Sequence, residues 1–378
     1  MGAIAKKLGT ARRVVRQYGV SGVTEIVRGK VAPYVLPPAD YARLIRPVGS
    51  LIARHGRPDI FVTANGAGIG DDLLCTAVFR ELRRRGVQKF WTTSKFPELY
   101  VNNGDAPVVV PALSRCDTLL RGLGTSVVYP FYTSYHPAFD RDEPLPQQHL
   151  ISIMCQKTGI TGEVTLRPYL GLTDEEALGG RLAERQIAIQ SGGLSAHHSM
   201  LNKNWFPERY QGVVDALKDR YQFVQVGSKH DPALEGAVDL RGKTTIRQTA
   251  AVLAQSLVFV GQVGFPMHLA RAVDCRSVIV YGGRETPAQS GYPCNENLHS
   301  ALPCSPCWRL NSCPYDRKCL RMVRVEDVVR AVERQVERHG AALEVDTATI
   351  TEEMIMTNVE RYEEAVRAHK HAWSVLLP

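Results

Sequence analysis

The chain contains no run of about 18 apolar residues, the length that a membrane-spanning helix needs. Its N-terminal residues also lack the apolar segment of a secretory signal peptide. These absences argue against a membrane span and a secreted protein, so we expect a cytoplasmic protein whose nine cysteines are reduced thiols. With 378 residues, 44% of them hydrophobic, the chain is long enough for two ordinary domains.

Acidic residues are scarce at the N-terminal end. Residues 1–57 contain eleven Lys and Arg but only Glu25 and Asp40, a balance of +9 in a chain whose net charge is +8. Apolar residues interleave with these charges at roughly helical spacing, as in helices that lie on anionic membranes. A helix packed on the body of the protein fits the same pattern, and no nucleic-acid-binding module accompanies the charge. We therefore expect residues 1–57 to form a basic, helical extension of one of these two kinds.

A glycine-rich turn, Gly66-Ala67-Gly68-Ile69-Gly70-Asp71-Asp72, separates an apolar run from an amphipathic helical segment. A dinucleotide-binding fingerprint would need glycine at position 71, and the next strand ends without a ribose-binding acid, so nicotinamide or flavin binding is disfavoured. Two interpretations of Asp71 remain. It is either the N-cap of the helix or a general base at the carboxyl end of a strand, where open α/β sheets bind their ligands.

Short apolar segments alternate with helical ones along most of the chain. The predicted strands are residues 60–63, 90–93, 107–110 and 127–132, then 187–190, 223–226, 257–260 and 278–281. This alternation is typical of parallel sheets covered by helices. A polar, proline-containing stretch near residue 170 separates the two halves. We predict two doubly wound α/β domains, residues 58–172 and 173–348, that face each other across a cleft, and a C-terminal helix, residues 349–378, that returns toward the first domain.

Four of the nine cysteines lie within sixteen residues, in the pattern C-x2-C-x5-C-x5-C formed by Cys304, Cys307, Cys313 and Cys319. The loop 304–319 contains prolines and has no strong periodicity. Four thiolates in such a loop are typical of a tetrahedral structural metal site, with zinc as the first candidate and iron as the second. Reduced cysteines without a metal are the alternative.

Four sequence blocks, in order, resemble glycosyltransferase family 9, the heptosyltransferase type. They are residues 68–74, 203–210, 239–245 and 259–270, and the resemblance runs from about Asp59 to about Gln335. It implies a GT-B fold, in which residues 58–172 bind the acceptor and residues 173–348 bind a nucleotide sugar. It also implies an inverting, metal-independent transfer of a sugar, with ADP-heptose as the first candidate donor. The acceptor would be a hydroxyl of a surface glycan, a glycolipid or a protein. Membrane binding by the basic extension would place the protein at the inner face of the cytoplasmic membrane.

The resemblance assigns Asp71 as the catalytic base and Lys203 as the lysine that contacts the donor phosphate. Other donor contacts are expected at Gly227, Ser228, Lys243, Thr244, Gln262, Gly264, Met267 and His268, and acceptor contacts at Gly68, Ile69, Gly70, Tyr132 and His136. The helix that opens near Pro266 would offer further N–H groups to the diphosphate. Ordinary structural roles remain open for several of these residues: a surface lysine, a packing histidine and core aromatics.

The chain departs from the family pattern on the donor side. Val263 replaces a carboxylate, and Lys229 stands where some members carry a ribose-binding glutamate. These departures keep a second hypothesis open, a non-catalytic nucleotide-sugar or glycan-binding protein derived from the same fold. The acidic pair in Asp140-Arg141-Asp142 lies in a proline-rich stretch and is expected to be a solvated loop.

Overall fold

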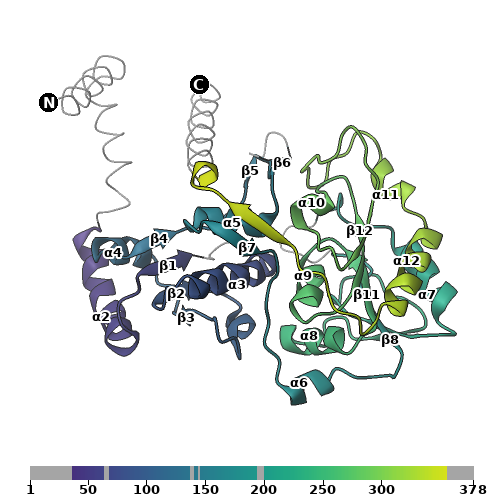
Figure 1. The fold of residues 1–378 in the computed structure, drawn as a ribbon, viewed down its shortest axis with the longest axis horizontal. Coiled ribbons are helices and arrows are strands. Elements are labelled where there is room, and N and C mark those ends of the chain that lie inside the picture. Colours follow the sequence, from purple (N-terminus) through teal and green to yellow (C-terminus); the bar gives the residue numbers. More distant parts are fainter. Residues whose placement is uncertain (1–35, 64–67, 137–139, 144, 194–199, 356–378) are drawn as a thin grey trace. The chain divides into compact units, whose positions relative to one another are not determined.

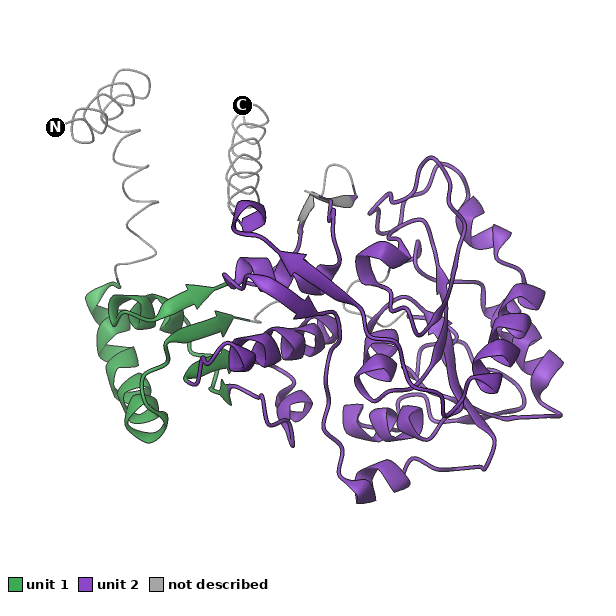
Figure 2. Ribbon diagram, viewed as in Figure 1, with its two compact units in different colours: residues 1–63, 89–93, 108–128 green, residues 64–88, 94–107, 129–378 purple. Residues whose placement is uncertain are grey.

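The computed structural model describes residues 36–63, 68–136, 140–143, 145–193 and 200–355 (Figure 1). The chain divides into two compact units (Figure 2). Unit 1 comprises residues 1–63, 89–93 and 108–128, and unit 2 comprises residues 64–88, 94–107 and 129–378. The predicted domains, 58–172 and 173–348, follow the sequence and cut across this division, so their boundaries stay a prediction.

Unit 1 contains a four-stranded parallel sheet in the order β3-β2-β1-β4. Its strands are β1 (Ile60–Thr63), β2 (Phe90–Thr93), β3 (Val108–Val109) and β4 (Ser126–Val128), and its helices are α2 (Pro38–His55) and α4 (Cys116–Gly122). The predicted strands 60–63 and 90–93 are confirmed. The predicted strand 127–132 is too long, because Pro130 has no N–H to donate to a neighbouring strand.

Helix α2 belongs to the core of unit 1. Leu44 and Val48 are buried and pack with Phe61, Trp91 and Leu120. This part of the predicted basic extension is therefore a helix packed on the body of the protein. Residues 1–35, which carry most of the predicted extension, lie outside the described residues.

Unit 2 is built around six parallel strands in the order β10-β9-β8-β11-β12-β13. They are β8 (Gln186–Ile189), β9 (Gln222–Gln225), β10 (Ala237–Asp239), β11 (Val258–Gln262), β12 (Ser277–Tyr281) and β13 (Glu296–His299). The four strands predicted in this half are confirmed within two residues at each end. The chain winds outward in one direction from β8 and in the other from β11, so the switch point lies between these two strands.

Helices cover both faces of this sheet (Figure 1). Helices α7 (Pro207–Leu217) and α12 (Val325–Glu337) pack on one face over a core that includes Val260, Val278 and Val328. Helices α8 (Ile246–Ala254) and α9 (Phe265–Ala272) cover the other. The strands read as nearly continuous apolar runs because both of their faces are buried.

The remaining elements of unit 2 are mostly short. They are α3 (Ile69–Arg84), η2 (Pro97–Tyr100), β5 (Ser134–His136), β6 (Arg141–Glu143), α5 (Leu150–Lys157), β7 (Gly162–Thr165), α6 (Asp174–Leu178), α10 (Pro287–Ser290), α11 (Lys318–Met322) and β14 (Thr347–Ile350). Strand β14 pairs antiparallel with β7, where the sequence predicted the start of the C-terminal helix. Residues 356–378, most of that predicted helix, lie outside the described residues.

The stretch Asp140-Arg141-Asp142, expected to be a loop, is a loop only at Asp140. Strand β6 begins at Arg141 and pairs with β5. The Asp140 carboxylate accepts the backbone N–H groups of Asn311 and Ser312 at 3.1 and 2.7 Å, so it holds the cysteine-containing loop.

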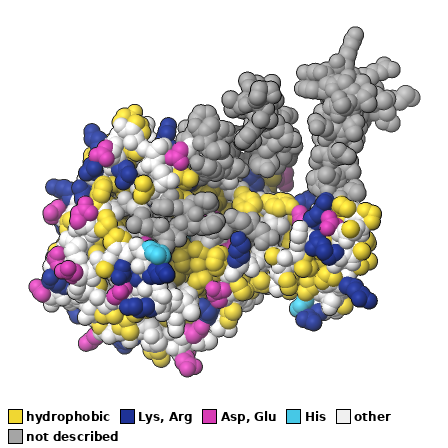
Figure 3. Space-filling model, turned by 180° about the vertical axis from the view of Figure 1, so that it is seen from behind, with side chains coloured by type: hydrophobic (Ala, Val, Ile, Leu, Met, Phe, Trp, Pro, Cys, Tyr) yellow, Lys and Arg dark blue, Asp and Glu magenta, His cyan; other side chains and the backbone are white. Residues whose placement is uncertain are grey.

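Surface charge on unit 2 is mixed. Basic and acidic side chains are interspersed over the face shown in Figure 3. None of the helices in the described ranges is long and apolar enough to cross a membrane.

Candidate functional site

Asp71 lies in the first turn of α3. The N-cap of this helix is Gly68, so the interpretation of Asp71 as the N-cap is wrong, and Asp71 occupies the third helical position instead. One carboxylate oxygen accepts the Gly68 N–H at 2.8 Å, and the other accepts the Tyr132 hydroxyl at 2.7 Å. These two donors fix the carboxylate at the positive end of the helix dipole.

The glycine-rich turn brings two helices together. A Cβ atom on Gly70 would lie 3.7 Å from the backbone of Phe265, the first residue of α9. Gly68 and Ile69 precede Asp71 on the same turn. The first turn of α3, with the predicted base, therefore lies beside the helix that was expected to face the donor diphosphate.

The environment raises the pKa of Asp71. Burial is the largest cause, and it outweighs the hydrogen bonds from Tyr132 and Gly68 and the positive charge of Lys203, all of which lower the pKa. The negative charge of Glu285 raises it further. A carboxylate whose pKa is moved toward neutrality is a stronger base than an exposed aspartate.

Lys203 forms an ion pair with Glu285. Lys203 ends a turn before α7, and Glu285 follows β12 at the carboxyl edge of the sheet. Only 2% of the Glu285 side chain is exposed, against 18% for Lys203. Burial alone would raise the pKa of Glu285, but the charges of Lys203 and Arg284 bring it below its usual range. The sequence did not single out Glu285.

Trp308, from the cysteine-containing loop, packs against this group. Its ring meets Tyr132 edge-on, with the ring centroids 6.5 Å apart, and the Arg284 guanidinium lies 4.9 Å from its centroid. Trp308 is 1% exposed, and its backbone N–H donates to the Arg284 carbonyl at 2.9 Å. Trp308 thus supports both the tyrosine that binds Asp71 and the segment that carries Glu285.

The cysteine-containing loop is hydrogen-bonded to Gly283, just after the end of β12. Cys307 donates its N–H to the Gly283 carbonyl at 2.7 Å, and the Gly283 N–H donates to the Cys319 sulfur at 3.0 Å. Burial raises the pKa of Cys307 and Cys319, and Cys313 also influences both. Within the described ranges, no three His, Cys, Asp or Glu side chains are arranged as ready metal ligands. The predicted metal site at Cys304, Cys307, Cys313 and Cys319 therefore stays a prediction.

Asp72 is a second carboxylate beside Asp71. It is 2% exposed and accepts a hydrogen bond from the Ser94 hydroxyl. Burial, followed by the charge of Asp71, raises its pKa to about 6.

His268 and Met267 lie in the first turn of α9 and are buried. The His268 Nδ1 atom is 2.6 Å from the Tyr292 hydroxyl, and burial lowers the pKa of His268 to about 3, so the imidazole is neutral at pH 7. Lys203 and Glu285 both influence this pKa. The Met267 sulfur accepts the Tyr281 hydroxyl at 3.3 Å within the core. Gly264 is the N-cap of α9.

Four other predicted donor contacts lie in the loops that follow β9 and β10. Gly227 accepts the Gly242 N–H at 2.8 Å, which ties the two strand ends together. Lys243 binds the Asp239 carbonyl at 2.7 Å, and Thr244 contacts the Thr249 hydroxyl at 2.8 Å. The Ser228 hydroxyl accepts a local N–H. The structure therefore gathers Asp71, Tyr132 and Lys203 in one group and these residues in another. The His136 side chain lies outside the described residues.

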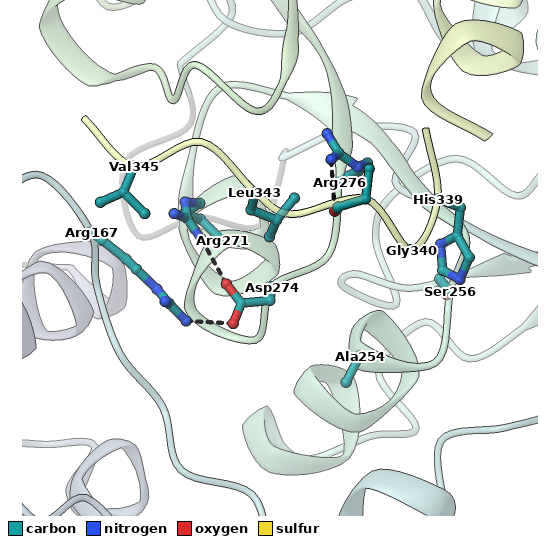
Figure 4. A pocket seen from close by; sticks show the side chains of 11 residues that line it. Arg167, Ala254, Ser256, Arg271, Asp274, Arg276, His339, Gly340, Leu343 and Val345 are labelled. Carbon is teal, nitrogen blue, oxygen red and sulfur yellow. Dashed lines mark hydrogen bonds and ion pairs between the residues drawn. The ribbon is translucent and has the colours of Figure 1, made fainter. Parts of the chain in front are cut away.

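A pocket of about 400 Å³ lies at the opposite, amino edge of the same sheet (Figure 4). Arg167, Arg271 and Arg276 line it, and Asp274 accepts hydrogen bonds from Arg167 and Arg271. Arg276 donates to the carbonyls of residues 341 and 342. Arg271 also donates to the Glu344 carbonyl, so Arg271 and Arg276 both bond the segment that follows α12.

Comparisons with known proteins agree with the predicted resemblance. Residues 183–314 match the sequence model of glycosyltransferase family 9 (heptosyltransferase). No curated protein matches the chain in sequence.

Three solved structures have a similar fold. The iron-containing dodecameric glycosyltransferase TibC of enterotoxigenic E. coli H10407 is 15% identical, with a TM-score of 0.57 over 75% of this chain and 76% of that one. E. coli ADP-heptose LPS heptosyltransferase II is 14% identical, with a TM-score of 0.56 over 75% and 100%. A family 9 glycosyl transferase of Veillonella parvula DSM 2008 is 16% identical, with a TM-score of 0.54 over 74% and 97%. These likenesses confirm the α/β, GT-B fold class.

Proposed function

We propose that this protein transfers a sugar from a nucleotide sugar to a hydroxyl group. The chain has the fold of the family 9 glycosyltransferases and matches their sequence model over residues 183–314. Residues 58–172 would bind the acceptor and residues 173–348 the donor. The observation that supports this proposal is that Lys203 and Glu285 form an ion pair and that the charges of both residues influence the pKa of Asp71. A base and a phosphate-binding cation in one group are the two parts that the reaction needs.

In the proposed mechanism, Asp71 removes the proton of the acceptor hydroxyl. The acceptor oxygen then attacks the anomeric carbon, while the bond between that carbon and the diphosphate oxygen breaks on the opposite face. The leaving nucleoside diphosphate takes the electron pair, and the anomeric configuration inverts. Each oxygen of Asp71 accepts one hydrogen bond from the protein, which leaves lone pairs for the acceptor hydroxyl.

Lys203 would neutralise the negative charge that develops on the diphosphate, and the N-terminus of α9 would add its dipole. In the described structure Lys203 is paired with Glu285. The diphosphate must therefore share Lys203 with Glu285 or replace it as the partner. No divalent metal is required in this scheme.

The substitution Asp71→Asn tests the mechanism. It keeps the shape of the side chain, so we expect an unchanged fold and nucleoside diphosphate affinity but turnover reduced by about 10²- to 10⁴-fold. Asp72→Asn is the matched control, because the neighbouring acid bonds Ser94 and should not be needed for turnover. Release of nucleoside diphosphate in the presence of acceptor is the measurement. Full activity of Asp71→Asn would refute the assignment.

A non-catalytic nucleotide-sugar or glycan-binding protein is the second candidate. Val263 favours it, because this apolar residue is 2% exposed where the family carries a donor-side carboxylate. A binding protein would bind a nucleotide sugar without releasing nucleoside diphosphate, whatever acceptor is offered.

ADP-heptose is the first donor to test. Two structures with a similar fold are associated with it, E. coli ADP-heptose LPS heptosyltransferase II and TibC in complex with ADP-D-beta-D-heptose. Surface glycans, glycolipids such as lipopolysaccharide, and proteins are the acceptor classes to offer.

We also propose that the loop 304–319 holds a structural zinc or iron ion. The support is the spacing of the four cysteines in the sequence, together with the sulfurs of Cys313 and Cys319, which accept N–H hydrogen bonds as metal-bound thiolates do. Metal analysis of protein purified without chelator should find about one equivalent. Much less than one equivalent would remove the site.

The basic N-terminal segment would bring the protein to the inner face of the cytoplasmic membrane. Removal of residues 1–35 tests this idea and spares α2, whose Leu44 and Val48 belong to the core of unit 1. The full chain should co-sediment with anionic vesicles at low salt and the truncated chain should not. Equal sedimentation of both would refute the proposal.

A further inference from the structure

The middle of the cysteine-containing loop, residues 308–312, contacts three separate parts of unit 2. It meets the residues after β12, the tyrosine that binds Asp71, and the turn that carries Lys203. We call residues 308–312 the bridging segment. None of its residues takes part in the proposed reaction, so their contacts with the site need another explanation.

Trp308 begins the bridging segment in an unfavourable backbone conformation. Its φ angle is 50°, in the left-handed region that bulky residues rarely adopt. Arg284 holds it there: the Trp308 N–H donates to the Arg284 carbonyl at 2.9 Å, and the Arg284 guanidinium donates to the Trp308 carbonyl. Strained residues of this kind persist only where the surrounding contacts impose the conformation, and they cluster at functional sites. Trp308 is therefore fixed against the residue that precedes Glu285.

The Trp308 ring is buried against Tyr132. Only 1% of Trp308 is exposed, and the planes of the two rings meet at 60°. Edge-on contacts of this kind favour one orientation of the ring pair. Because the Tyr132 hydroxyl donates to Asp71, Trp308 limits the positions from which this donor can hold the Asp71 carboxylate.

The rest of the bridging segment holds the turn that carries Lys203. Asn202, the neighbour of Lys203, is 4% exposed. Its Nδ2 atom donates to the carbonyls of Arg309 and Ser312 at 3.3 and 2.9 Å. Its backbone N–H donates to the Leu310 carbonyl at 3.1 Å. Lys203 therefore follows a residue whose backbone and side chain are both bonded to the bridging segment.

Asn311 adds a further bond to the same turn. Its Oδ1 atom accepts the Leu201 N–H at 3.0 Å. The backbone N–H groups of Asn311 and Ser312 donate to the Asp140 carboxylate, so the bridging segment is also held by the residue before β6. Asn311 is exposed, so its side chain can be changed without opening the core.

We propose that the bridging segment positions the base and the phosphate-binding lysine for the reaction. Trp308 acts through Tyr132 on Asp71, and Asn311 acts through the turn that it bonds on Lys203. Both are positioning residues, since neither binds the donor or the acceptor in the proposed mechanism. This inference rests on the proposed function, because it concerns how the two groups of that reaction are held.

The substitution Asn311→Ala tests the contact with the turn. It removes the oxygen that accepts the Leu201 N–H, so Lys203 should be held less firmly. We expect ADP to bind about three- to tenfold more weakly, as for one lost hydrogen bond. Ser305→Ala is the matched control, because it removes a bond to His299 in the same loop but outside the bridging segment. This control should bind ADP as the wild type does in titration calorimetry.

A second measurement separates positioning from a general loss of structure. In a Lys203→Met background, Asn311→Ala should weaken ADP binding no further, because the lysine that it positions is already absent. An equal loss of ADP affinity in both backgrounds would overturn the inference. Unchanged ADP affinity of Asn311→Ala in the otherwise wild-type chain would also overturn it.

The substitution Trp308→Leu tests the contact with the base. The Tyr132 hydroxyl lowers the pKa of Asp71, so a tyrosine that is held less firmly should let this pKa rise. The acidic limb of kcat/KM should then move to higher pH, by no more than in Tyr132→Phe. In the Tyr132→Phe background, Trp308→Leu should add no shift. The charged groups that interact with Asp71 are the same in all these variants: Lys203, Glu285 and Asp72.

Trp308→Phe keeps an aromatic ring beside Tyr132 and should keep the acidic limb of the wild type. An acidic limb that Trp308→Leu leaves in place, or moves further in the Tyr132→Phe background, would overturn the inference. The Asn311 measurements do not depend on the folding of the Trp308 variants, because Asn311 is exposed.

The wild type separates the two levels of the account. If it binds ADP and turns over a donor while Asn311→Ala and Trp308→Leu behave as the wild type does, the inference fails and the proposed function stands. If the wild type binds neither ADP nor a nucleotide sugar, both fail.

Discussion

Buried polar side chains at the two edges of the six-stranded sheet in unit 2 differ in their hydrogen bonding. At the amino edge, Gln186 is fully bonded, and Arg276 donates to backbone carbonyls. At the carboxyl edge, Gln190 and Gln262 keep unpaired oxygens, and Glu285 is a buried carboxylate that holds one lysine. The residues are similarly buried at both edges, so burial alone does not mark a functional site.

Among the described residues, unpaired buried atoms occur at both edges, including Arg167 Nε and Gln335 Oε1 at the amino edge, and at the carboxyl edge they accompany the buried ion pair of Lys203 and Glu285. In the pocket of about 400 Å³ at the amino edge, Arg271 and Arg276 donate to carbonyls of the segment that follows α12, and Arg167 donates to Asp274 (Figure 4). At the carboxyl edge, hydrogen-bonding capacity is left unused beside the pair of Lys203 and Glu285. Removal of polar groups should therefore cost stability at the first edge and ligand binding at the second.

The largest effect on stability is expected at the amino edge. Arg276→Met removes a charged donor that is 3% exposed and binds the carbonyls of Ala341 and Ala342, both at 3.0 Å. We expect a loss of about 4 kcal/mol in the free energy of unfolding, because charged hydrogen bonds are lost and carbonyls are left unpaired. Denaturant unfolding measures this loss. A loss of turnover in the folded variant would contradict the assignment of this edge to structure.

Asp72→Asn should stabilise the protein at high pH. The folded-state pKa of Asp72 is raised to about 6 from 3.8, so its contribution to stability is present below pH 3.8 and is lost as the pH rises through 6. Asparagine stays neutral, and the variant should gain about 3 kcal/mol in the free energy of unfolding at pH 8. The gain should vanish below about pH 4. A variant that is less stable than the wild type at pH 8 would contradict this account.

Lys203 and Glu285 should have opposite effects on diphosphate binding. Lys203→Met removes the cation, and we expect ADP to bind about 10- to 100-fold more weakly, as for a lost charged hydrogen bond. Glu285→Gln removes the competing carboxylate and should strengthen ADP binding. Titration calorimetry at low salt measures both. Weaker ADP binding by Glu285→Gln would show that Glu285 positions Lys203 for the ligand and does not compete with it.

The smallest effect, a shift in the pH dependence of kcat/KM, is expected from Tyr132→Phe. The Tyr132 hydroxyl lowers the pKa of Asp71, so its removal should raise that pKa further. Asp71 acts as a base only when ionised, so the acidic limb of the profile of kcat/KM against pH should move to higher pH. Activity on the alkaline side should change little. An acidic limb at the wild-type position would mean that another group controls it.

Much of the fold followed from the sequence, because buried parallel strands are short apolar runs. The strands 60–63 and 90–93 were predicted to the residue. Strands β10 and β13 were missed, since their sequences, Ala237–Asp239 and Glu296–His299, contain polar residues and lie at the two sides of the sheet. The predicted strand 127–132 overran its end at Pro130.

The site was predictable in part. The sequence blocks around Asp71 and Lys203 predicted a role for both residues. In the structure the charge of Lys203 influences the pKa of Asp71, so the two side chains interact. Glu285 and Trp308 were missed because their contacts, Lys203 and Tyr132, are distant in the sequence. One signal could have found Glu285: it is an acid placed just after a buried strand, the same reasoning that drew attention to Asp71. Gln262 was an expected donor contact, whereas the unpaired atoms of Gln190 and Asn204 carry no sequence signal, since only packing shows which atoms lack partners.

The most direct test of the account is a crystal structure of the protein with ADP-heptose or, if that donor does not bind, with ADP. The account predicts the diphosphate within hydrogen-bonding distance of Lys203, at the carboxyl edge of β8 and β11. A diphosphate bound instead between Arg167, Arg271 and Arg276 at the amino edge would contradict it.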